Sequence, residues 1–175
     1  MRFVTPAECV TWCDARGYAT TVFPGHSQPT VADPASFVFA SFEPPQDSGR
    51  KVALSRVLIS LLEPADEYLL WLGEWGVWES SQHMPLVSSL RQAHAEHRPL
   101  HETPAFLFTP AERDAAQSFL LIALVFFWDC HVLSCSGAEA IHISHDEHGW
   151  YGSRTALQTA RAEHRLSAFF GAGSA

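Results

Sequence analysis

The sequence gathers ionisable side chains into one short segment, residues 141–148. Its first four residues alternate apolar and polar side chains, which is typical of a half-buried strand. Loops that follow strands often carry chemistry because a rigid scaffold holds them. Histidine and carboxylate side chains bind zinc, and two histidines with one carboxylate bind non-haem iron. The segment therefore offers four candidate ligands for zinc or iron, namely His142, His145, Asp146 and His148, although their spacing is generic and a polar loop without metal is the favoured interpretation.

A second group of histidines lies at residues 94–102. On a helix, His94 and His97 would share one face, because residues three apart are neighbours on its surface. We expect His97 or His101 to complete the metal site if the fold brings the two groups within about 4 to 5 Å, as shared tetrahedral coordination requires. The alternative is a solvated helix end and a polar loop that bind no metal.

Aromatic side chains surround a single carboxylate in the stretch of residues 71–78. The carboxylate is Glu74, and its neighbours are Trp71, Trp75 and Trp78. A carboxyl group among aromatic rings can act as an acid, because an apolar environment raises its pKa. Tryptophans more commonly fill a core or line a protein interface, where aromatic residues are enriched. We favour the core or interface hypothesis.

Asp129 follows a long apolar stretch, so its carboxylate must find hydrogen-bond donors. A backbone amide or an arginine such as Arg91 or Arg56 is the expected donor, with a structural ion pair favoured, and a catalytic base is the alternative. The neighbouring Cys130 would need a nearby base to act as a nucleophile. His131 does not meet that need, because adjacent residues of a strand point to opposite faces.

Composition narrows the classes of protein that this chain can be. It has 175 residues, 47% of them hydrophobic, and a net charge of −8. We expect one domain over residues 1–170 and a flexible tail over 171–175. The charge argues against nucleic acid as a partner and is compatible with a basic protein partner. The most apolar stretch is too short for a bilayer and no leader opens the chain, so we expect a cytoplasmic protein without membrane contact.

Two predicted helices begin with the same four-residue sequence. Residues 5–8 and 109–112 both read Thr-Pro-Ala-Glu, which is a capping box with proline in the first turn. The first helix should end near Gly17, and the second should run to about Phe127 as a central buried helix. Further helices are predicted at residues 82–97 and 154–170.

Strands are predicted where β-branched and aromatic residues cluster. We expect one hairpin from residues 52–62 and 68–78, a second from 131–135 and 140–144, and a shorter strand at 37–42. Together these elements predict an α+β domain. Its sheet of about five strands would be mostly antiparallel, with helices packed on one face.

Several motifs together carry a resemblance. Glu74–Trp78 (EWGVW) and Ser144–Glu147 (SHDE), with Trp128-Asp129 between them, resemble a group of small uncharacterised bacterial proteins. The resemblance covers residues 5 to about 150 and implies a free-standing single domain with no known activity. It transfers no catalytic residue.

Three classes of function remain in view, the last of which is a purely structural or self-associating module. The first is a non-enzymatic protein-binding module that presents an acidic, aromatic-bearing surface, with an immunity-type toxin antagonist as one form. The alternative is a small metal-dependent enzyme, a hydrolase, that uses the segment 142–148. No P-loop, nucleophile elbow or zincin motif occurs in the sequence, so no catalytic signature decides between them.

Overall fold

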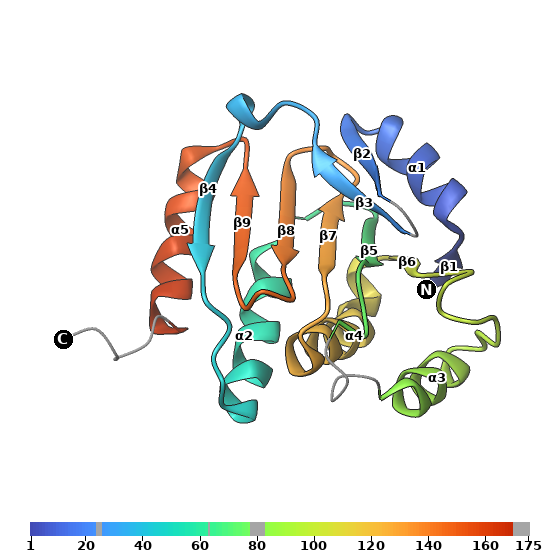
Figure 1. Cartoon of the computed structure of the whole chain (residues 1–175). Helices are drawn as coiled ribbons and strands as arrows, with labels where there is room; N and C mark the ends of the chain where they lie inside the picture. The colour runs from blue at the N-terminus through green and yellow to red at the C-terminus, as the bar shows by residue number, and fades with distance from the viewer. Residues whose placement is uncertain (24–25, 63, 78–82, 170–175) are drawn as a thin grey trace.

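The computed structural model describes residues 1–23, 26–62, 64–77 and 83–169. Its centre is a seven-stranded sheet in which all neighbouring strands are antiparallel (Figure 1). In spatial order the strands are β1 (Arg2–Val4), β6 (Ala105–Phe108), β5 (Tyr68–Leu72), β7 (Cys130–Ser134), β8 (Glu139–Ile143), β9 (Gly149–Ser153) and β4 (Val38–Phe42). The α+β class and the antiparallel sheet are confirmed, and the sheet has more strands than the five expected.

Helices cover one face of the sheet. They are α2 (Ser48–Leu61), α4 (Arg113–Phe126) and α5 (Ala156–Leu166), with α3 (Met84–Ala93) beside them. Leu54 and Leu58 of α2 meet Phe119 and Leu120 of α4 in one core with Tyr151 of the sheet. No helix in the described parts of the chain is long and apolar enough to cross a membrane.

A smaller layer covers the opposite face. It consists of α1 (Pro6–Asp14) and a two-stranded hairpin, β2 (Tyr18–Phe23) and β3 (His26–Val31). Cys9 and Tyr18 of this layer pack on Leu69, Trp71 and Leu133 of the sheet. The expectation that helices cover only one face was therefore wrong. The hairpin escaped prediction because it contains Pro29 and several polar residues, which weaken a strand pattern.

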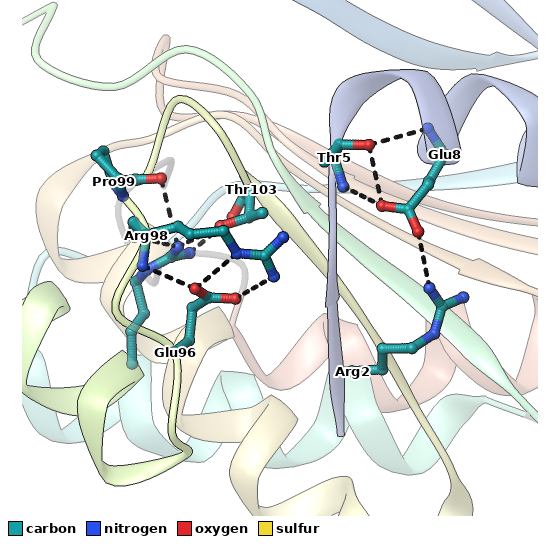
Figure 2. A network of polar contacts seen from close by, with 8 residues as sticks. Arg2, Thr5, Glu8, Glu96, Arg98, Pro99 and Thr103 are labelled. Carbon is teal, nitrogen blue, oxygen red and sulfur yellow. Dashed lines mark hydrogen bonds and ion pairs between the residues drawn. The ribbon is translucent and has the colours of Figure 1, made fainter.

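The two capping boxes are confirmed. The hydroxyl oxygen of Thr5 accepts a hydrogen bond from the backbone N–H of Glu8, and the Glu8 carboxylate accepts one from the N–H of Thr5 at 2.8 Å (Figure 2). Thr109 and Glu112 form the same pair, with a 3₁₀ turn over Pro110–Glu112 that leads into α4. These short-range bonds need no distant partner, so local sequence suffices to predict them.

The predicted strand at residues 52–62 is wrong, because this segment lies in α2. Asp47 caps the helix by accepting a hydrogen bond from the N–H of Arg50 at 2.8 Å. Leu54 and Leu58 lie one turn apart and are both fully buried, so the segment buries one helical face. Its β-branched residues suggested a strand, but the spacing of its buried leucines is helical.

Other predicted elements differ mainly in their ends. The strand expected over residues 68–78 ends at Leu72, and the helix expected over 82–97 is α3, which ends at Ala93. Strands β1, β6 and β9 were not predicted from the sequence. The tail expected at residues 171–175 lies outside the described residues.

A buried arginine fixes the connection from α3 to β6. Arg91 is 3% exposed and donates hydrogen bonds to the carbonyl oxygens of Thr103 at 2.7 Å and Arg98 at 2.9 Å. Glu96 accepts from the guanidinium of Arg98 in the same loop (Figure 2). Arg91 is thus the donor for carbonyl groups that the loop would otherwise leave unpaired.

Replacing Arg91 by alanine should destabilise the fold strongly. The change removes the donors of a buried carbonyl group, so we expect the free energy of unfolding to fall by about 2–4 kcal/mol. Urea unfolding measures the difference. Arg165→Ala, at an exposed position of α5, should change it by less than about 0.5 kcal/mol. Equal losses in both variants would contradict this role of Arg91.

Candidate functional site

Three chain segments meet at one edge of the sheet. Leu72 at the end of β5 pairs with Cys130 at the start of β7, and Cys130 pairs with Ile143 at the end of β8. The residues just beyond these strand ends therefore lie side by side. They are Glu74, Asp129 and His145. His145 belongs to the turn between β8 and β9, which the hydrogen bond from the N–H of Ser144 to the carbonyl of His148 closes.

Backbone hydrogen bonds hold two of these residues in place. The N–H of Asp129 donates to the carbonyl oxygen of Glu74 at 2.9 Å, and the N–H of Gly73 donates to the carbonyl oxygen of Asp129 at 2.7 Å. A side chain at position 73 would put its Cβ only 3.0 Å from the Cβ of Asp129. Glycine at position 73 therefore allows the two segments to lie this close.

The side chain of Asp129 holds His145. Its Oδ1 accepts a hydrogen bond from the backbone N–H of His145 at 2.7 Å and lies 2.9 Å from Nδ1 of the same residue. On the other side of the ring, Nε2 lies 3.5 Å from Oδ1 of Asp146. Oε2 of Glu74 lies 4.0 Å from the Nδ1 atom. The imidazole of His145 is therefore surrounded by three carboxylates.

The cluster is suited to two kinds of chemistry. One ligand atom each from Glu74, Asp129 and His145 lies within 4.8 Å of the other two. Zinc ligands lie about 2.0–2.2 Å from the ion, so a small rotation of the half-exposed Glu74 side chain would bring all three to one metal. Without a metal, Asp129 would hold the Nδ1 proton and leave Nε2 as a proton acceptor, as in a histidine base.

The structure divides the predicted metal ligands between several places. Asp146 is exposed beside the cluster, whereas His142 lies on the face of the sheet and His148 is exposed in the turn. Within the described residues, neither His97 nor His101 joins a group of three ligands. His97 is exposed, and His101 borders a small recess of about 100 Å³ with Trp71 and Trp75.

Two of the aromatic residues singled out from the sequence, Trp71 and Trp75, border the same recess but pack against different cores. Trp71 is buried in the core beneath α1 and the hairpin, and Trp75 is partly buried against the opposite core. Trp78 lies outside the described residues. Of the two donors expected for the Asp129 carboxylate, the backbone amide is present, since the N–H of His145 donates to it. The expected arginine is not its partner, because the ring of His145 lies there and Arg91 binds carbonyl groups.

A second polar feature crosses the sheet and was missed by sequence reasoning. Trp71 pairs with His131, His131 with His142, and His142 with Trp150, so the four side chains form one row on the face beneath β3. The two imidazole rings stack with their centroids 4.4 Å apart. Burial lowers the pKa of His131 well below its usual value and lowers the pKa of His142 to about 4. We call these four residues the sheet row.

Comparison with known proteins assigns no family to the chain. No family model, no curated protein and no solved structure matches it. The resemblance to uncharacterised bacterial proteins stays a prediction. Function must therefore be inferred from the geometry of the site and the surface.

The stability of the protein should decrease between pH 6.5 and pH 4.5. Over this range the unfolded chain protonates His142, whereas the folded chain, in which the pKa of His142 is about 4, largely does not. The free energy of unfolding should fall by about 2 kcal/mol more in the native protein than in His142→Phe, which keeps a ring at this position. Urea unfolding at pH 7.5 and 4.5 measures this difference. Parallel losses in the two proteins would contradict it.

Proposed function

We propose that this protein binds a divalent transition metal at Glu74, Asp129 and His145 and uses an open coordination position for hydrolysis. The observation that carries the proposal is the convergence of three strand ends on one group of ligand atoms, all within 4.8 Å of one another. The ligands come from positions far apart in the sequence. Of the candidate ligands in the segment 142–148, the proposal keeps only His145. Glu74 and Asp129 take the place of the others.

The chemistry of the ligands supports a metal of the zinc type. Two carboxylates and one imidazole are ligands that suit zinc, manganese and iron(II). Three protein ligands leave a position for water, and a metal in such a site lowers the pKa of its bound water toward neutrality. The site is open, since the side chain of Glu74 is 43% exposed and that of His145 is 21% exposed.

Neighbouring groups would position the ligands before a metal arrives. The backbone of Asp129 is tied to β5, and its carboxylate, 9% exposed, is fixed by the N–H of His145. Asp146 lies beside Nε2, the ring nitrogen that faces away from the cluster. Carboxylates in this second position orient metal-bound histidines and fix the tautomer of the ring.

Zinc titration of the purified protein tests the proposal. We expect one equivalent of Zn²⁺ per chain, with an affinity that falls at least 100-fold in His145→Ala and Glu74→Gln, because each loses a ligand. Isothermal titration calorimetry and elemental analysis after dialysis measure this. His164→Ala, an exposed histidine of α5, is the matched control and should bind like the native protein.

Three further readouts sharpen the test. His142→Phe should keep its metal. Loss of metal in this variant would favour the ligands expected from the sequence segment 142–148 over Glu74, Asp129 and His145. Co²⁺ in place of Zn²⁺ should give a visible spectrum that azide shifts, which reports an open position. An unchanged zinc affinity in folded His145→Ala, confirmed by circular dichroism, would overturn the proposal.

A second candidate function is the binding of a basic protein. A cleft of about 650 Å³ beside the β8–β9 turn is lined by four carboxylates and, among its described residues, one cation, Arg50. The carboxylates belong to Glu43, Asp47, Asp146 and Glu147. With a net charge of −8, the protein would attract a basic partner to this cleft. A toxin with an exposed basic segment is one such partner.

Paired charge variants distinguish this cleft from the overall charge. Asp146→Asn/Glu147→Gln and Asp66→Asn/Glu163→Gln remove the same charge, but the second pair lies at exposed positions that do not line the cleft. An arginine-rich peptide should bind about tenfold more weakly to the first variant than to the second, by fluorescence anisotropy at physiological salt. Equal weakening would show attraction by net charge alone.

A further inference from the structure

A pocket of about 440 Å³ lies over the sheet row, where the small layer leaves the sheet incompletely covered. His131, His142 and Trp150 of the row line it from the sheet, and Pro29 and Val31 line it from β3. In Figure 1, β3 crosses the upper part of the sheet near β7. The volume lies within the range of about 300–1,000 Å³ that is usual for small-molecule sites. The pocket is separate from the Glu74–Asp129–His145 cluster, which shares none of its lining residues.

Aromatic rings give the pocket its shape. Phe39 and Trp150 meet edge to face, with centroids 5.2 Å apart and planes at 85°. His142 lies 5.5 Å from Trp150 on the other side, with the planes tilted by 46°. Pro34 adds a further flat apolar surface beside the rings. Offset and edge-to-face arrangements favour a planar aromatic ring as the occupant.

The pocket carries no net charge. None of its described lining residues is an Asp, Glu, Lys or Arg. The described lining therefore offers no Asp, Glu, Lys or Arg side chain that could pair with a charged ligand. An acidic protein with a net charge of −8 also repels anions. An uncharged ligand therefore fits this pocket best.

One polar atom beneath the pocket lacks a partner. Nε2 of His131 is buried and makes no hydrogen bond to the described residues. Buried polar atoms in native proteins are nearly always hydrogen-bonded, so an exception calls for an explanation. His131 is 4% exposed and lies against the ring of His142, which is only partly buried. His131 and His142 both line the pocket, so a ligand there can meet Nε2 only if the His142 ring rotates aside.

We propose that this pocket binds a small, neutral aromatic molecule with one hydroxyl group. The ring of the ligand stacks against Trp150 and His142, and its hydroxyl group pairs with Nε2 of His131. A hydroxyl group can both donate and accept, so it satisfies either tautomer of the histidine. The ligand thus supplies Nε2 of His131 with a hydrogen bond that the described residues do not provide.

Two matched probes test the proposal. 2-Naphthol has a planar ring and one hydroxyl group, and naphthalene has the ring alone. We expect 2-naphthol to bind about tenfold more tightly, because it gains a hydrogen bond to a buried partner. On addition of 2-naphthol, the chemical-shift changes of the protein's backbone amides should be centred on β3, β8 and β9. EDTA in every sample keeps metal out, so the outcome is independent of the proposed metal site.

Variants assign each part of the ligand to a residue. His131→Phe should bind both probes with similar affinity, since it keeps a ring and loses the nitrogen. Trp150→Ala should bind both about tenfold more weakly, and Leu157→Ala, exposed on α5, should bind both like the native protein. Thermal unfolding checks each fold, and His131→Leu replaces His131→Phe if the latter does not fold.

Clear outcomes would overturn the proposal. Absence of binding by both probes up to their solubility limits would show that the pocket takes no aromatic ligand. A preference for 2-naphthol that persists in folded His131→Phe or His131→Leu would show that His131 does not recognise the hydroxyl group. Shift changes centred elsewhere would show adventitious binding only.

Discussion

Burial of the central sheet on both faces is the constraint on which this structure depends. Antiparallel sheets commonly leave one face to water. Here every residue of β5 and β7 is buried, because α2 and α4 cover one face while α1 and the β2–β3 hairpin cover the other. A polar side chain in the middle of such strands must be paired or neutral. Chemistry is therefore confined to the strand ends and to gaps in the covering layers.

The two sites proposed above correspond to these two places. At the strand ends, Asp129 joins the segments after β5 and β8 through hydrogen bonds of its backbone and its carboxylate. In the gap beside β3, His131 and His142 stay neutral and lie among aromatic rings. A carboxyl group within the sheet is paired, as in Glu139 of β8, which accepts a hydrogen bond from the hydroxyl of Tyr151. The strand-end carboxylates, which are nearer to solvent, are the charged groups of the site.

Local sequence predicts those features that depend on neighbouring residues. The capping boxes at Thr5 and Thr109 need only four residues each, and both are present. The segment 52–62 was misassigned because its β-branched residues were given more weight than the helical spacing of Leu54 and Leu58. The strands β1, β6 and β9 are three to five residues long and carry too little periodicity to be recognised.

The candidate site was predictable only in parts. Glu74 and Asp129 stood out as carboxylates in an aromatic or apolar setting, and His145 as one of a run of ionisable side chains. Their meeting depends on the register that aligns Leu72, Cys130 and Ile143, which a single sequence does not contain. His131 was considered only as a partner of Cys130. Its real partner is His142, which is opposite to it on the next strand.

The strand order has a consequence for how the chain can assemble. Both edge strands come from the first part of the sequence, yet β1 pairs with residues 105–107 and β4 pairs with residues 149–153. During synthesis β9 emerges about 100 residues after β4, so β4 stays without its partner over that interval. Such long sequence separations slow folding, because loop closure precedes any gain from pairing. Until β9 is made, β4 is an unpaired strand that carries Phe39 and Phe42. Such a strand can pair with other chains, so the nascent protein must avoid this aggregation.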